Sequence, residues 1–174
     1  LMALLPPQFG VYHEPFLGGG ALFFNILPPK ARLSDSNSEL INAYHVVKTH
    51  SEALIKSLKY HQNTREYFNF IRDCQPRQLD PITRASRFIY LNKTCYNGLY
   101  RVNRSGRFNV PFGSYKKLAY TDTENLAAVS EALQGAAIEV NDFSVVLAEA
   151  KPGDLVYFDP PYQPLSKTAS FTSY

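Results

Sequence analysis

The sequence predicts an α/β fold with a doubly wound parallel sheet, because strand-like and helical segments alternate near both ends of the chain. We expect a short strand at residues 11–14 that runs into a glycine turn and the apolar start of a helix. Residues 32–34 repeat this pattern and lead through a polar turn into a second helix. Its apolar residues at helical spacing are Leu40, Ile41, Tyr44 and Val47. Successive strand–turn–helix units are typical of such sheets.

The alternation stops in the middle of the chain and then returns. We expect a helix at 123–133, a strand at 137–140, a helix at 143–150 and a last strand at 154–158. Before them come three amphipathic helical stretches and a basic loop rich in Gly and Asn. The sequence therefore predicts a core of residues 1–50 and 119–174, interrupted by a helical insertion at 51–118.

The insertion carries a strong excess of positive charge. Between residues 84 and 117 there are eight Lys or Arg and no Asp or Glu, which leaves the rest of the chain with a formal net charge of −5. A basic segment in an otherwise acidic chain suggests a polyanionic partner, usually nucleic acid. The alternative is a solvated loop in which these charges cluster by chance.

The composition is that of an ordinary globular protein, with 45% hydrophobic and 19% charged residues. A chain of 174 residues has room for one domain with a substantial core. Cys74 and Cys95 match no zinc-binding spacing, and we expect reduced thiols. No apolar run approaches the roughly 18 residues that cross a membrane, and the opening LMALLPP lacks a signal-peptide pattern. These features predict a cytoplasmic protein without a membrane anchor.

The stretch EPFLGGG at 14–20 predicts a ligand-binding turn after the first strand. Glycines let the backbone approach a ligand closely at the N-terminus of a helix. If Gly18 and Gly20 began a dinucleotide-binding fingerprint, its third glycine would fall at Phe23, so a pyrophosphate site is disfavoured. A turn with a purely structural role is the alternative.

Acidic residues follow two further strands. Asp35 ends the second strand, where a carboxylate can accept hydrogen bonds from both ribose hydroxyls of a ligand. The segment Asn141 to Phe143 follows the third strand, where an acid and an aromatic ring could bind an adenine. The alternatives are an ordinary turn at Asp35 and a simple helix start at 141–143.

The motif DPPY at 159–162 follows the last apolar strand and is the most specific signal. An aromatic amine such as adenine N6 must move toward tetrahedral geometry before it can attack a methyl group. A fixed carboxylate and a backbone carbonyl can each accept a hydrogen bond from one of its two N–H groups. Prolines restrict the backbone that carries this carbonyl, and they have no N–H that could compete. Tyr162 could stack on a base that has left the duplex. The alternative is a strand-ending turn with an exposed tyrosine.

In this order, the motifs resemble the Dam group of DNA adenine-N6 methyltransferases, the D12 class. The matching segments are EPFLGGGALFFN, LSDSNSELINAY, RFIYLNKTCYNGLYRVNRSGRFNVPFGSYKK and VYFDPPYQPLSKTASFTSY. The resemblance implies a Rossmann-like S-adenosylmethionine-dependent methyltransferase fold with an inserted helical DNA-recognition subdomain. It also implies methyl transfer to adenine N6 in double-stranded DNA, within the sequence GATC.

The resemblance assigns two groups of residues at the sheet. Those expected to bind S-adenosylmethionine are Phe16, Gly18, Gly20, Asp35, Asp142, Phe143 and Asp159. Those expected to act on the target base are Asp159, Pro160, Pro161 and Tyr162. Asp159 and the Pro160 carbonyl would bind the amino group, and Tyr162 would stack on the flipped adenine.

The resemblance also assigns DNA-binding residues, which are Lys93, Tyr96, Asn97, Leu99, Arg101, Pro111, Lys116 and Ser166. The pair at 96 and 97 would enter the duplex and support the flipped state. Leu99, Arg101 and Pro111 would read bases, and a guanidinium suits the O6 and N7 atoms of guanine. The remaining three would contact phosphates.

The chain departs from the family pattern at three places. Ser114 stands where close Dam relatives carry an arginine, no KWAGGK-type segment precedes Leu1, and 12 residues follow Tyr162. We therefore expect part of a longer enzyme. Two alternatives stay open, namely methylation of RNA or of another amino group, and a module that binds DNA or cofactor without turnover. No metal or obligate protein partner is implied, and we expect a monomer.

Overall fold

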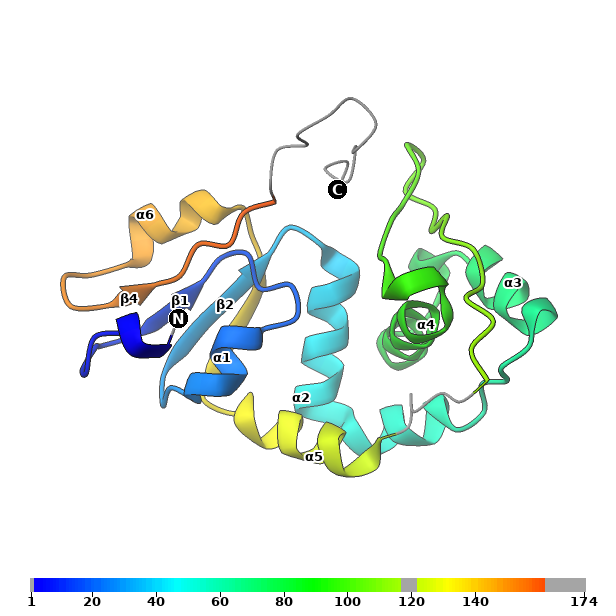
Figure 1. Cartoon of the computed structure of the whole chain (residues 1–174), viewed down its shortest axis with the longest axis horizontal. Helices are drawn as coiled ribbons and strands as arrows, with labels where there is room; N and C mark the ends of the chain where they lie inside the picture. The colour runs from blue at the N-terminus through cyan, green and yellow to red at the C-terminus, as the bar shows by residue number, and fades with distance from the viewer. Residues whose placement is uncertain (1, 117–121, 162–174) are drawn as a thin grey trace.

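The computed structural model describes residues 2–116 and 122–161, and its parallel sheet lies in the left half of the view in Figure 1. The four strands are β1 (Tyr12–Glu14), β2 (Ala31–Asp35), β3 (Ala136–Val140) and β4 (Leu155–Val156). Their spatial order is β3-β2-β1-β4, and Tyr12 pairs with Ala31 on one side and Leu155 on the other. The strand order therefore reverses between β1 and β4.

Helices cover the two faces of the sheet unequally. On one side lie α1 (Ala21–Ile26), α2 (Ser38–Leu58) and α5 (Thr123–Ala132), and on the other lies the short α6 (Val146–Glu149) (Figure 1). Because side chains alternate along a strand, Leu33 is buried among the helices while Arg32 reaches the α6 face, where it pairs with Glu149 at 2.7 Å. The predicted α/β fold with a parallel sheet is confirmed.

Two elements near the carboxyl end differ from the expected ranges. The helix expected at 143–150 is a 3₁₀ turn, Phe143–Val145, followed by α6. The strand expected at 154–158 pairs only over β4, although the Tyr157 N–H still donates to the His13 carbonyl at 2.9 Å. In the described part of the chain, no helix is long and apolar enough to span a membrane.

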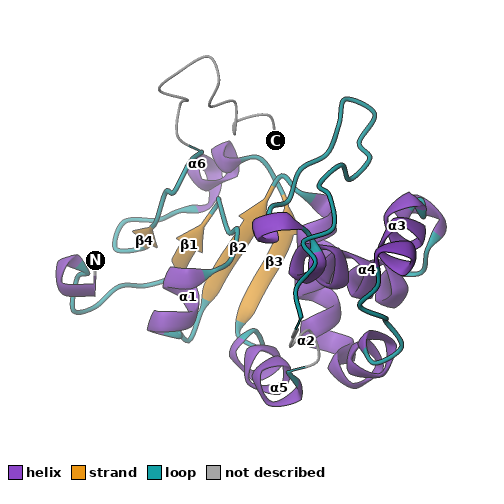
Figure 2. Cartoon of the chain, turned by 45° about the vertical axis from the view of Figure 1, so that its right-hand side comes forward, coloured by secondary structure: helices purple, strands orange, loops and turns teal. Residues whose placement is uncertain are grey.

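The insertion contains α3 (Arg65–Asp73) and α4 (Pro81–Thr94), which lie beyond α2 and away from the sheet (Figure 1). It has a small core of its own, formed by Phe68, Tyr90, Leu91, Cys95, Phe108 and Val110. The chain after α4 rises on the same side of the molecule as the ends of the strand arrows (Figure 2). α2 continues through the predicted junction at 50, but its helical backbone breaks there, at His50 with φ −138° and ψ 36°.

Candidate functional site

The carboxyl ends of the four strands bring predicted site residues to one edge of the sheet. Gly18 follows β1, Asp35 ends β2, Asp142 follows β3 and Asp159 follows β4. In open α/β sheets, ligands bind in the crevice outside these ends, where the strand order reverses. Here the reversal lies between β1 and β4, so the turn at Gly18 and the segment at Asp159 flank that crevice.

The two glycines of the turn after β1 have different reasons to be glycine. Gly18 has φ +45° and Gly20 has φ +63°, both in the left-handed region. A Cβ on Gly20 would lie 2.9 Å from the Phe24 ring and 3.2 Å from the Tyr44 hydroxyl, whereas a Cβ on Gly18 would meet nothing within 4 Å. Packing therefore requires Gly20, and the open space at Gly18 leaves its backbone accessible to a ligand.

Asp35 joins the end of β2 to this turn. Its Oδ2 accepts a hydrogen bond from the Gly18 N–H at 3.1 Å, and its Oδ1 accepts from the Asn37 N–H at 2.9 Å. Each oxygen keeps a lone pair for another donor. On the other side of the turn, the Tyr44 hydroxyl donates to the Gly18 carbonyl at 3.0 Å. Burial, followed by the charges of Glu14 and Asp35, raises the pKa of Tyr44, so this phenol remains a donor.

Three phenylalanines from different strand ends gather at the same edge. The Phe16 ring stacks on Phe143 with centroids 5.4 Å apart and lies 6.2 Å from Phe158. Phe143 and Phe158 are about half exposed, which is unusual for large apolar rings and gives flat surfaces on which a base could stack. Asp142 caps the turn that begins at Phe143, because its Oδ1 accepts from the Ser144 N–H at 3.0 Å. These hydrogen bonds with Ser144 lower the pKa of Asp142.

The segment after β4 places Asp159, Pro160 and Pro161 on the surface. Asp159 lies close enough to the buried Glu14, at the end of β1, for the two charges to interact. Burial raises the pKa of Glu14, hydrogen bonds from the Tyr12 hydroxyl and the Phe23 N–H lower it, and the charge of Asp159 raises it again. The charge of Asp159 thus acts on a carboxyl of the neighbouring strand. Tyr162, the last residue of the motif, lies outside the described residues.

The predicted DNA-reading residues come together in a recognition segment, defined here as residues 96–111. Tyr96 is 54% exposed, and its N–H donates to the Pro111 carbonyl at 2.8 Å, so the two ends of the segment meet. Asn97 has φ +54°, and its N–H donates to the Tyr115 hydroxyl at 2.9 Å. Leu99 is also exposed. The segment therefore presents a tyrosine, an asparagine and a leucine to solvent from a fixed turn.

Arg101 is exposed but already oriented by a neighbour. Its Nε donates to Asn109 Oδ1 at 2.8 Å, and the Asn109 N–H donates back to the Arg101 carbonyl at 3.0 Å. Lys93, in the last turn of α4, and Lys116 are exposed as well. Ser166 lies outside the described residues. Ser114 accepts a long hydrogen bond of 3.5 Å from Arg65 of α3.

Two of the eight basic residues counted in the sequence have structural roles. Arg84 forms an ion pair with Glu39 of α2. Arg87 is 6% exposed, and it donates to the carbonyls of Ile71 and Arg72 at 2.9 and 2.8 Å. The exposed members among the described residues are Lys93, Arg101, Arg104, Arg107 and Lys116. The basic surface is therefore smaller than the sequence count suggests and is concentrated at and around the recognition segment.

Sequence reasoning did not identify Glu14, Tyr44 and Asn109 as contributors. The contact between Tyr12 and Glu14, with the hydroxyl 2.8 Å from Oε2, follows from their two-residue spacing along β1 and was detectable. Tyr44 was placed on the apolar face of its helix, and its bond to Gly18 spans 26 residues. Nothing local in the sequence signals that bond.

These features define an α/β protein whose candidate site lies at the carboxyl ends of its parallel strands, where ligands bind in open α/β sheets. The comparison with known families identifies the particular one. Residues 1–174 match the family described as D12 class N6 adenine-specific DNA methyltransferase, and the chain belongs to this family.

Individual relatives are similar over almost the whole chain. A type II methyltransferase of Lactococcus lactis subsp. cremoris, M1.LlaDCHI, is 45% identical over 179 residues, which cover 98% of this chain and 63% of the relative. M.MjaIII of Methanocaldococcus jannaschii is 42% identical, with coverage of 94% and 62%. The DNA adenine methylase of Escherichia coli is 39% identical, with coverage of 92% and 59%. The chain spans about three-fifths of the length of these relatives.

Proposed function

We propose that this chain carries the central part of an enzyme that transfers a methyl group from S-adenosylmethionine to adenine N6 in duplex DNA. The observation that carries the proposal is the position of Asp159 and Pro160 at the strand-order reversal, directly after Phe158, whose ring lies 6.2 Å from that of Phe16 before the glycine turn. Membership of the family, and relatives named as DNA adenine methylases, support the choice of substrate. GATC is the proposed target sequence.

The residues present fit S-adenosylmethionine. The oxygens of Asp35 keep free lone pairs beside the open backbone of Gly18, which suits ribose hydroxyls. The exposed ring of Phe143, which stacks on the half-buried Phe16, offers a stacking surface for its adenine. The carboxylates of Glu14 and Asp159 give the region the negative potential that a sulfonium cation prefers. When bound, S-adenosylmethionine supplies an electrophilic methyl group.

The chain's own groups then have distinct tasks. Asp159 and the Pro160 carbonyl each accept a hydrogen bond from one of the two N–H groups of the target amine. These two hydrogen bonds direct the lone pair of the nitrogen out of the plane of the base ring. The N–C bond would form as the methyl–sulfur bond of the cofactor breaks, which leaves S-adenosylhomocysteine. The Asp159 carboxylate would stabilise the positive charge on the nitrogen until its proton passes to water. Tyr162 stacks on the flipped adenine in this proposal. Neither a covalent enzyme intermediate nor a metal is required.

The recognition segment would bind the duplex. Tyr96 and Asn97 enter the helix at the target, Arg101 reads guanine in the major groove, and Leu99 and Pro111 contact neighbouring bases. Lys93, Lys116 and Ser166 contact phosphates, which add affinity without sequence information. The exposed cations around this segment support the assignment.

The test is a methyl-transfer assay on a GATC duplex, a scrambled duplex and an RNA of the same sequence, with the protein that contains this chain. Asp159→Ala should lower kcat about 100-fold or more while the DNA Kd stays within about threefold, because the lost carboxylate acts only on the reacting amine. Asp73→Ala removes an exposed carboxylate at the end of α3 and serves as the matched control. Retained turnover in Asp159→Ala would contradict its role, and preference for RNA would replace the proposed substrate.

A further inference from the structure

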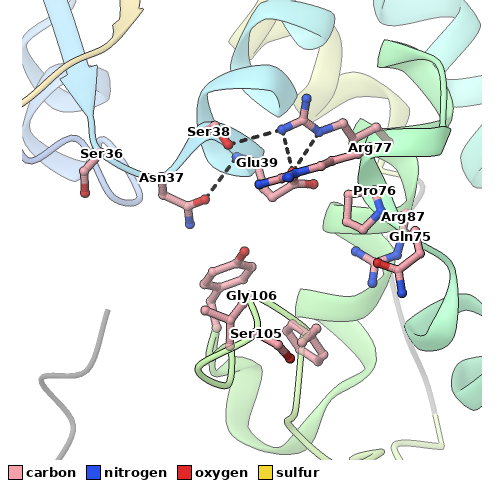
Figure 3. Close-up of a pocket in the computed structure, with 14 residues that line it drawn as sticks. Ser36, Asn37, Ser38, Glu39, Gln75, Pro76, Arg77, Arg87, Ser105 and Gly106 are labelled. Carbon is pink, nitrogen blue, oxygen red and sulfur yellow. Dashed lines mark hydrogen bonds and ion pairs between the residues drawn. The ribbon is translucent and has the colours of Figure 1, made fainter.

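A cleft of about 440 Å³ lies between the first turn of α2 and the insertion (Figure 3). Residues 36–39 form its wall on the side of the sheet. Arg84 and Arg87 of α4, together with Tyr100 of the recognition segment, belong to the wall on the side of the insertion. The wall formed by 36–39 continues directly from Asp35, so this cleft separates the candidate cofactor site from the candidate DNA-reading surface.

An ion pair connects the two walls. Arg84 Nε donates to Glu39 Oε1 at 2.8 Å, its Nη2 lies 2.5 Å from the same oxygen, and Nη2 also donates to Ser38 Oγ at 3.2 Å. The side chains of Arg84 and Glu39 are only 25% and 14% exposed. Among the residues that the structure describes, Glu39 Oε2 is the buried side-chain oxygen without a hydrogen-bond partner. Glu39 therefore depends on Arg84 for compensation of its charge.

A further hydrogen bond connects the same elements, because Asn42 Nδ2 donates to the Pro81 carbonyl at 3.0 Å. Asn37 and Tyr100 both line the cleft, from its two walls. Asn37 also caps α2, because its Oδ1 accepts from the Glu39 N–H at 3.0 Å, and its own N–H binds Asp35. One turn of chain thus holds Asp35 on one side and the insertion on the other.

α4 extends this connection to the recognition segment. The helix runs from Pro81 to Thr94, and the turn that begins at Tyr96 follows after one residue. From Arg84 to Tyr96 the distance along a helix would be about 18 Å, at about 1.5 Å per residue. A small rotation of α4 about the Arg84 contact would therefore displace Tyr96 by much more than it displaces Arg84.

We propose that Arg84 and Glu39 are positioning residues that fix the recognition segment relative to the Asp35 turn, so that cofactor and DNA strengthen each other's binding. A ligand at Asp35 fixes the position of the first turn of α2, and the ion pair then fixes the position of α4 relative to that turn. Such coupling is reciprocal, so DNA must raise cofactor affinity by the same factor. The inference rests on the proposed function but concerns binding rather than turnover.

The experiment measures the Kd of S-adenosylhomocysteine, which cannot donate a methyl group, with and without a saturating GATC duplex in the full protein that contains this chain. The ratio of the two Kd values is the coupling factor. Glu39→Gln and Arg84→Gln should each lower this factor about fivefold or more, toward 1. The double variant should do no worse than either single one, because one interaction is lost in all three. Thermal unfolding of each variant measures any general loss of stability separately.

Arg32→Gln is the matched control, because it breaks an ion pair of 2.7 Å with Glu149 on the α6 face, away from the insertion. Its coupling factor should equal that of the parent. A parent factor of 1, unchanged factors in both single variants, or losses that multiply in the double variant would each overturn the proposal. A parent that methylates no DNA would instead refute the proposed function, since the binding ratio needs no turnover.

Discussion

The edge of the sheet and the recognition segment hold their candidate residues in different ways. At the sheet edge, backbone geometry does most of the positioning, because Gly18 and Asp35 sit at strand ends and are joined through a backbone N–H. In the insertion, hydrogen bonds of side chains do most of the positioning. Asn109 orients Arg101, and the guanidinium of Arg87 connects α4 to the end of α3. The first arrangement depends on the sheet, whereas the second depends on single side chains and should be easier to break.

Arg87→Leu is expected to have the largest effect on stability. The substitution leaves the carbonyls of Ile71 and Arg72 without their buried donor, and it should lower the free energy of unfolding by about 2–4 kcal/mol. Chemical denaturation followed by circular dichroism measures this change. Arg104→Leu, at an exposed position of the recognition segment, is the control and should change the free energy by less than about 0.5 kcal/mol. An equal loss of unfolding free energy in the two variants would show that the insertion does not depend on the hydrogen bonds of Arg87.

Gly20→Ala and Gly18→Ala test the backbone at the sheet edge. Gly20→Ala combines a left-handed φ with a contact of 2.9 Å to Phe24 and should cost about 2 kcal/mol or more. Gly18→Ala meets open space and should cost only about 1 kcal/mol for its φ. If the proposed function holds, the order reverses for cofactor affinity, because the backbone at Gly18 is the accessible one. Thermal unfolding and titration with S-adenosylhomocysteine measure the two effects, and the same order in both would argue against a ligand at Gly18.

The comparison also explains how much the sequence could predict. The turn at Gly18, the acid at Asp35 and the position of Asp159 follow from strand ends, because parallel strands bring their carboxyl ends to one edge. The ion pair of Arg84 and Glu39 joins residues 45 positions apart, and no local pattern distinguishes it from two solvated charges. For the same reason, the basic count in the sequence included Arg87, which is buried.

His61 provides a pH-dependent test of the insertion. Its ring stacks on Tyr90 at 4.3 Å and lies 2.9 Å from Ser86 Oγ, and burial lowers its pKa from 6.5 to about 4. Between these values the unfolded chain binds a proton that the folded chain does not, so stability falls as the pH drops from about 6.5 to about 4. The expected loss is about 1–2 kcal/mol after allowance for partial solvent screening.

His61→Gln should flatten this dependence in urea unfolding at pH 7 and pH 4.5. His45→Gln, on the exposed side of α2, is the control and should keep the slope of the parent. An unchanged slope in His61→Gln would assign the acid sensitivity to other groups.

Asn109→Ala should have the smallest effect on stability but a specific one on recognition. The bond from Arg101 Nε to Asn109 Oδ1 restricts a long side chain before DNA arrives, and its loss returns rotamer freedom that binding must then remove. We expect discrimination between GATC and a duplex with one guanine replaced to fall about fivefold, measured as the ratio of kcat/KM values. Asn103→Ala is the control, because Asn103 shapes the tip of the segment through the Ser105 and Arg107 N–H groups. It should leave that ratio near the parent value. If Asn109→Ala leaves the ratio unchanged while Arg101→Ala lowers it, Arg101 reads the base without pre-orientation, and the side-chain positioning inferred for the insertion would not extend to its reading residue.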